Sequence, residues 1–189
     1  MMPDFSSKQF VIVHGYMASP EAHWFPWLKA QLEQARAAVH VPALPFSQNP
    51  DPQLWAETLE TVLPHLNERT VLVGHSLGCV TLLRHVLSRP EGETLGGYVL
   101  VSGFDQPLQT LPQLDAFTAR PLDYADLQRR TAFRASVFSD NDQIVAPQLS
   151  RALAAALETT TLEVPGGGHF LGREGYEQFP ALLDLLRQA

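Results

Sequence analysis

The chain has 189 residues and a mass of 20.9 kDa, which suits one ordinary domain with a sizeable hydrophobic core. Hydrophobic residues make up 45% of it and charged residues 17%, a composition that excludes an intrinsically disordered chain. The formal net charge is −7, and the longest run of basic residues is the pair Arg129–Arg130. These features argue against nucleic acid and against acidic membrane surfaces as partners.

The sequence also argues against a metal, a cofactor or a disulfide. Cys79 is the only cysteine, so no intramolecular disulfide can form. The sequence contains no His-Glu-x-x-His motif, phosphate loop or dinucleotide fingerprint. The first apolar stretch, Phe10–Val13, is too short for the apolar region of a signal peptide. We therefore expect a cytoplasmic protein without a metal or cofactor.

The first predicted strand, Phe10–Val13, ends at His14-Gly15. The following Ser19-Pro20-Glu21 has the residues of a helix N-terminus, and the predicted helix runs through Leu32. Next come a weak strand over Val39–Val41, interrupted by prolines, and a helix from Pro52 to about Leu63.

The clearest buried strand, Thr70–Val73, is followed at once by Gly74-His75-Ser76-Leu77-Gly78. This pentapeptide fits Gly-x-Ser-x-Gly, and an apolar helix over 79–87 follows it. A strand, a tight glycine-bounded turn and a helix form the setting of a nucleophile elbow, in which the serine hydroxyl is exposed at a helix N-terminus. Ser76 is therefore the candidate nucleophile.

The chain then continues through a strand at Tyr98–Val101 into an irregular segment, 104–123, which contains three prolines. A structureless stretch of this length in a compact domain is functional or a small cap. Because it follows a strand's carboxyl end, where open α/β sheets bind ligands, we expect it beside the active-site crevice.

A serine nucleophile needs a base and an orienting acid, and this motif predicts the chain order serine, acid, histidine. Asp142 follows the predicted strand Phe133–Phe138 and is the favoured acid. Asp140 and Asp105 are competitors, with Asp140 better suited to shaping the turn.

The candidate base is His169. It follows a predicted helix over 147–157, a strand at Thr160–Val164 and the glycine run 166–168, and it precedes a predicted helix over 175–187. A glycine-rich loop could bring its imidazole over the serine. Short strands alternating with longer helices indicate one domain over 1–189, with a mostly parallel, doubly wound sheet of about six strands and helices on both faces.

The tetrahedral intermediate requires two backbone N–H donors. Leu77, directly after the nucleophile, is the first candidate. The second belongs to the loop after the first strand, where Tyr16 is favoured and Met17 is the alternative. Met17, Trp24, Phe104 and Phe170 are candidates for an apolar substrate pocket, although aromatic residues in the first helix suit a core equally well.

Four blocks, 14–28, 74–79, 139–145 and 166–170, resemble the small serine hydrolases of the α/β-hydrolase superfamily. The similarity is greatest to the retinoblastoma-binding-protein-9-like family, which includes bacterial YdeN-type proteins, and it covers essentially the whole chain. It implies a reduced α/β-hydrolase fold with almost no lid, and a triad of Ser76, Asp142 and His169. The namesake's Leu-x-Cys-x-Glu protein-binding motif does not occur here, so protein partners are left open.

These residues lead to a functional hypothesis. The expected activity is hydrolysis of small acyl substrates, short-chain esters first and amides second, through an acyl-enzyme. The alternative is a binding protein that keeps the fold but has weak or no catalytic activity. Cofactor-free perhydrolysis would use the same triad, and sequence does not separate it from ester hydrolysis.

Overall fold

The computed structural model describes residues 4–189, and its centre is a six-stranded parallel sheet with the order β2-β1-β3-β4-β5-β6. This confirms the predicted parallel sheet with helices on both faces. The strands are β1 (Gln9–Val13), β2 (Ala38–His40), β3 (Thr70–His75), β4 (Gly97–Val101), β5 (Arg134–Ser139) and β6 (Thr160–Val164).

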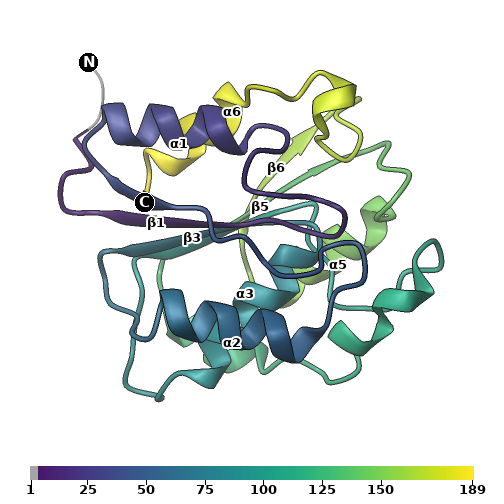
Figure 1. Cartoon of the computed structure of the whole chain (residues 1–189), viewed down its shortest axis with the longest axis horizontal. Coiled ribbons are helices and arrows are strands. Elements are labelled where there is room, and N and C mark those ends of the chain that lie inside the picture. The colour runs from purple at the N-terminus through teal and green to yellow at the C-terminus, as the bar shows by residue number, and fades with distance from the viewer. Residues whose placement is uncertain (1–3) are drawn as a thin grey trace.

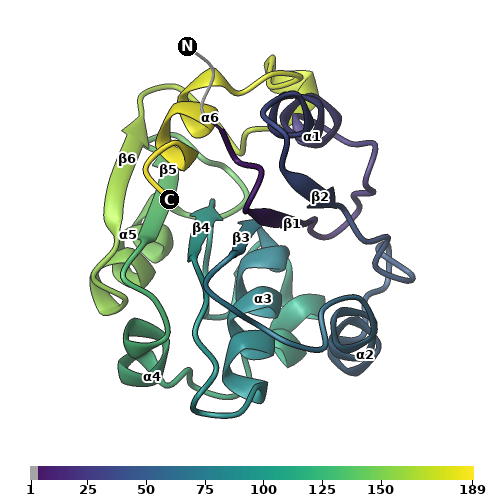
Figure 2. The same cartoon turned by 90° about the vertical axis from the view of Figure 1, so that its left-hand side faces the viewer.

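Helices cover both faces of the sheet, as the two cartoon views show (Figures 1 and 2). On one face lie α1 and α6, and on the other lie α2, α3, α4 and α5. The helices are α1 (Phe25–Gln34), α2 (Pro52–Val62), α3 (Leu77–Ser88), α4 (Tyr124–Arg129), α5 (Pro147–Ala156) and α6 (Pro180–Leu186), with 3₁₀ turns η1 (Pro112–Phe117) and η2 (Gly172–Glu174).

The sheet separates two hydrophobic clusters because alternate strand residues face opposite sides. In β3, Leu72 packs with α2 and α3, whereas Val71 and Val73 pack with α1 and α6. The central strands β3 and β4 are buried along their whole length, as expected for strands covered by helices on both faces.

Two predicted helices begin later than their sequence suggested. The first starts at Phe25, not near Ser19, because His23 has a φ of 53°, which no helix accommodates, and Pro26 stands in the first turn. The last starts at Pro180, because Gly175, with a φ of 92°, ends η2 and breaks the expected helix. In both helices the proline in the first turn, Pro26 or Pro180, indicates the start of the helix better than the residues on which the prediction relied.

The irregular segment 104–123 contains η1, and α4 follows it as a helix that the sequence did not predict. The α4 helix is only six residues long, and its N-cap Asp123 accepts a hydrogen bond from the amide of Asp126. A helix this short offers too few residues for an amphipathic period to be visible.

All six strands are parallel, so their carboxyl ends meet at one edge of the sheet. The chain leaves β1 toward β2 on one side and then crosses to β3 on the other side of β1. This reversal places the loop after β1 beside the turn after β3, at the position where open α/β sheets bind their ligands.

Candidate active site

The turn between β3 and α3 holds Ser76 in a strained conformation. Its φ of 55° and ψ of −123° lie outside the regions that non-glycine residues ordinarily occupy. The strain is maintained by close packing: a Cβ on Gly78 would lie 2.1 Å from the carbonyl oxygen of Val13. The two glycines of the motif thus allow helix, strand and neighbouring loop to approach, which raises the serine above the sheet edge.

His169 and Asp142 form a buried pair at the same edge. The Nδ1 atom of His169 lies 2.7 Å from Oδ2 of Asp142, and both side chains are almost completely buried. The other carboxylate oxygen, Oδ1, accepts hydrogen bonds from the amides of Ile144 and Val145 at 2.8 and 3.0 Å. Every Asp142 oxygen therefore has a partner, and the carboxylate is fixed toward the imidazole.

The two competing carboxylates have other partners. Asp140 accepts a hydrogen bond from the amide of Gly166 at 2.8 Å, and so links the loop after β5 to the glycine run before His169. Asp105 accepts one from the hydroxyl of Tyr124. Of the three candidate acids, only Asp142 is hydrogen-bonded to His169 among the described residues.

The backbone of the His169 loop is held by side chains from three directions. His75 Nε2 donates to the carbonyl oxygen of His169 at 2.8 Å. Glu174 Oε2 accepts from the amides of His169 and Leu171 at 2.9 and 3.0 Å. Asn141 accepts from the amide of Gly168 at 2.8 Å. The imidazole is consequently positioned by its backbone as well as by Asp142.

Sequence reasoning missed Glu174. It lies one residue before the helix predicted over 175–187, and a single exposed glutamate near a glycine has no pattern that distinguishes it. Its role becomes visible only when the loop brings its carboxylate back to the two amides.

Three histidine rings, His23, His75 and His169, lie close together beside the elbow. The His75 ring centroid is 5.0 Å from that of His169 and 5.6 Å from that of His23. Burial lowers the pKa of His75 well below its usual range, with the nearby His169 adding to the effect, and burial also lowers the pKa of His23. Both rings are therefore neutral at pH 7.

The loop after β1 passes directly over the elbow. A Cβ on Gly15 would lie 3.1 Å from Cβ of Ser76 and 3.3 Å from the amide nitrogen of Leu77. The amide of Met17 donates to the carbonyl oxygen of Ser47 at 2.8 Å. His14 anchors this loop, because its Nε2 accepts from the amide of Leu44 and its Nδ1 lies 3.0 Å from the oxygen of Gly15.

A cavity of about 460 Å³ opens over Ser76 and His169. Met17 and the irregular segment 104–123 contribute to it. The other lining residues come from the loops at this edge of the sheet: Gly15, Tyr16, Ala18, His23, His75, Thr110, Leu111, Ile144, Leu171 and Arg173.

Three residues expected in the pocket lie in the core instead, and the prediction is corrected for them. Trp24 packs against Phe25, His75 and Phe179. Phe104 is buried in the cluster beneath α3. Phe170 follows His169 but has a φ of 56°, and its ring stacks on Phe179 at a centroid distance of 4.9 Å. A large aromatic side chain beside a site can be core or lining, and sequence does not show which way it points.

Cys79 is buried one helical turn after the elbow, and burial raises the pKa of its thiol well above the usual range. Its Sγ lies 3.4 Å from the carbonyl oxygen of Val101. Cys79 is therefore a packed core residue, not a nucleophile. No group of three or more His, Cys, Asp or Glu side chains within residues 4–189 is arranged to hold a metal ion.

Comparison with known proteins identifies the family. A serine hydrolase family model matches residues 10–188. The chain belongs to this family of serine hydrolases. It is 39% identical over 180 residues to the YdeN hydrolase of Bacillus subtilis, with 95% of each chain covered. It is also 23% identical to the serine hydrolase RBBP9 of Rattus norvegicus, with 88% of each covered.

Solved structures agree with this family assignment. The YdeN crystal structure superposes with a TM-score of 0.93, covering 96% of this chain and 97% of that one. The esterase RhEst1 from Rhodococcus superposes with a TM-score of 0.68 at 13% identity, covering 99% and 91%. The second likeness shows the shared α/β-hydrolase fold. The chain is thus a hydrolase with an open six-stranded α/β-hydrolase sheet, and no helix within residues 4–189 has the length and apolarity to cross a membrane.

Proposed function

We propose that this serine hydrolase cleaves short-chain carboxylic esters through an acyl-enzyme, with Ser76 as nucleophile, His169 as base and Asp142 as the orienting acid. The observation that carries the proposal is the buried 2.7 Å contact between His169 Nδ1 and Asp142 beside a strained Ser76 in one cavity. This contact leaves Nε2 of His169 to receive the serine proton.

In the first half of the reaction, Ser76 Oγ attacks the ester carbonyl carbon as His169 Nε2 takes its proton. The tetrahedral intermediate collapses when the imidazolium gives this proton to the leaving alkoxide. Water, deprotonated by His169, then attacks the acyl carbon, and the imidazolium returns the proton to Ser76 Oγ as the carboxylic acid leaves. The imidazolium formed in each half is stabilised by the Asp142 carboxylate.

The oxyanion donors in this proposal are the amides of Leu77 and Tyr16. Leu77 is the first residue of α3, where amides have no partner within the helix and the helix dipole favours negative charge. The bond from the Met17 amide to Ser47 supports Tyr16 over Met17, because an amide already donating to a carbonyl is not free for an oxyanion.

Short acyl groups are favoured by the size of the cavity and by its lining. A volume of about 460 Å³ accommodates a small ester, and Met17, Leu111 and Ile144 give it apolar walls.

Labelling with an alkyl fluorophosphonate tests the proposal. We expect one adduct on the intact protein, located at Ser76, and none on Ser76→Ala. Hydrolysis of p-nitrophenyl acetate should fall by about 10⁶-fold in Ser76→Ala, the size found when a triad nucleophile is removed. Labelling elsewhere, or neither labelling nor turnover in the unaltered protein, would contradict the triad and favour a binding protein that retains only the fold.

A further inference from the structure

Two arginines stand out by their lack of partners. Arg120 and Arg173 are the arginines whose guanidinium groups make neither a hydrogen bond nor an ion pair with any residue in the part of the chain that the structure describes. In a chain with a formal net charge of −7, unpaired cations are the exception. Arg120 lines a second hollow of about 440 Å³, together with Pro52 and Arg84, whereas Arg173 lines the cavity above Ser76.

The cavity above Ser76 has two different walls. Tyr16, Leu111 and Ile144 form an apolar wall, and all three pack against the cluster around α2 and α3. A second part of the lining consists of His23 and of residues from the loop that carries His169, including Leu171 and Arg173. Arg173 is the only Lys or Arg among the described lining residues.

The backbone around Arg173 is anchored relative to the triad. The amide of Gly172 donates to His23 Nδ1 at 3.0 Å, and the amide of Glu174 donates to the carbonyl oxygen of Leu171 at 2.9 Å. The Glu174 carboxylate, the next charge along the chain, accepts from the amides of His169 and Leu171 and makes no ion pair with Arg173 within residues 4–189. The guanidinium therefore projects from a fixed backbone with its donors unused.

The mechanism decides which part of a substrate meets this wall. His169 must give its proton to the leaving oxygen, so the leaving group lies on the side of the cavity that His169 forms. An unpaired guanidinium on that side offers charge-assisted, bidentate hydrogen bonds to an anionic group. The acyl group is left to the apolar wall.

On the basis of the proposed esterase function, we propose that Arg173 is a specificity-determining residue that selects esters whose leaving alcohol carries a carboxylate. The neutral His23 on the same wall supplies no positive charge, so Arg173 is the cation there that can attract a carboxylate. The Arg173 side chain is exposed to solvent, so the strength of its contact with a carboxylate should fall as ionic strength rises.

Two esters that differ in one charge test this inference. In 4-acetoxybenzoate the leaving phenol carries a carboxylate, whereas in 4-acetoxybenzamide it is neutral. We expect the ratio of their kcat/KM values to fall about fivefold in Arg173→Gln, the effect of losing one partly screened charge contact. Arg173→Lys should keep part of the preference, and Arg173→Glu should lower the ratio further. Arg120→Gln, the other unpaired arginine, is the matched control and should leave the ratio unchanged.

A second pair of esters tests the acyl side. Phenyl hydrogen adipate carries a carboxylate on its acyl group, whereas the acyl group of phenyl hexanoate is neutral, and both esters release phenol. The assignment to the leaving group is wrong if Arg173→Gln lowers the kcat/KM ratio of this second pair and not that of the first, or if it lowers neither ratio. It is also wrong if Arg120→Gln changes the ratio of the first pair by the same factor as Arg173→Gln.

A binding experiment separates a failure of the esterase proposal from a failure of the role proposed for Arg173. Protection of Ser76 from fluorophosphonate labelling by 4-hydroxybenzoate, relative to 4-hydroxybenzamide, reports binding without turnover. We expect selective protection by the carboxylate in the unaltered protein and its loss in Arg173→Gln. Protection by both compounds alike would overturn the role of Arg173 even if esters are hydrolysed, and a protein that neither labels nor hydrolyses esters would overturn both proposals.

Discussion

At the scale of single residues, the side chains that the structure brings together could be predicted wherever their position depends on local sequence and chain order. Ser76 stands in a five-residue motif between a strand and a helix, and His169 and Asp142 follow the carboxyl ends of later strands. Glu174 and Arg173 could not be predicted, because their importance depends on where a loop folds back and not on their neighbours in sequence.

A substitution at Asp142 tests the assignment of the acid. In Asp142→Asn the amide oxygen should keep the bonds to the amides of Ile144 and Val145, so its NH₂ group would face His169 Nδ1. The imidazole must then accept at Nδ1 and carry its proton on Nε2, which is the wrong tautomer for a base. We expect kcat for p-nitrophenyl acetate to fall by about 10³- to 10⁴-fold.

Asp140→Asn is the matched control, because an amide oxygen can still accept from Gly166. Its kcat should stay within a few-fold of the unaltered protein. Equal losses in the two variants would mean that the loop, and not the acid, had been disturbed.

At the scale of elements, buried strands were predicted well and helix starts less so. The strands β1, β3, β4 and β5 lie within two residues of their predicted bounds, because short apolar runs ended by glycine or serine leave little choice. The starts of α1 and α6 depend on which of several prolines and turn residues begins the helix. For α1 the tertiary contacts of His23 with Phe25 and His75 favour the later start, and for α6 the positive φ of Gly175 does so. Strand order could not be predicted at all, since it depends on long-range pairing.

The contact between α3 and β1 can be tested at Gly78. A Cβ there would lie 2.1 Å from the carbonyl oxygen of Val13 and 2.6 Å from that of His14, and backbone atoms of a central strand cannot move aside. We expect Gly78→Ala to lower the free energy of unfolding by about 3 kcal/mol in urea denaturation. Gly92→Ala has no atom within 4 Å of its new Cβ and should change it by less than about 0.5 kcal/mol. Similar midpoints for the two variants would show that α3 can shift away from β1.

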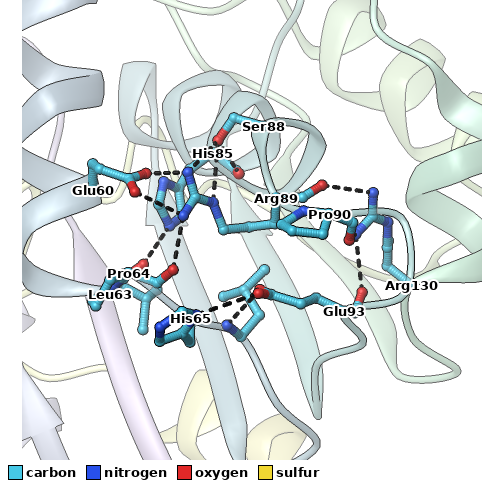
Figure 3. Close-up of polar contacts among 11 residues, drawn as sticks. Glu60, Leu63, Pro64, His65, His85, Ser88, Arg89, Pro90, Glu93 and Arg130 are labelled. Atoms are coloured by element: carbon cyan, nitrogen blue, oxygen red, sulfur yellow. Dashed lines mark hydrogen bonds and ion pairs between the residues drawn. The ribbon is translucent and has the colours of Figure 1, made fainter.

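At the scale of the whole molecule, the candidate active site and a buried polar network lie at opposite edges of the sheet. The elbow begins α3 at the edge that carries the site, so the end of α3 lies at the other edge, where a polar network joins it to α2 and α4 (Figure 3). In this network Arg130, which is 2% exposed, donates to the carbonyl oxygens of Arg89, Pro90 and Glu93 and pairs with Asp126. His85 Nε2 donates to the carbonyl oxygen of Leu63 at 2.9 Å.

His85 provides a test of how this network responds to pH. Burial lowers its pKa below the usual value of about 6.5, an effect that the hydrogen bond to Leu63 and the charges of Glu60 and Glu93 partly offset, while Arg89 adds to it. The unfolded chain therefore takes up the proton before the folded protein does. The stability that neutral His85 contributes is complete above pH of about 6.5 and is lost as the pH falls toward the folded pKa, by at most about 1.4 kcal/mol per pH unit.

We expect the free energy of unfolding, measured in urea between pH 7 and 5.5, to decrease less steeply in His85→Gln than in the unaltered protein. Glutamine can still donate to the Leu63 carbonyl but does not titrate, so the two stability curves should converge as the pH falls. His40→Gln, at an exposed position of the edge strand β2, should leave the slope unchanged. Parallel curves for His85→Gln and the unaltered protein would show that His85 titrates alike in the folded and unfolded states, and that its burial carries no cost in acid.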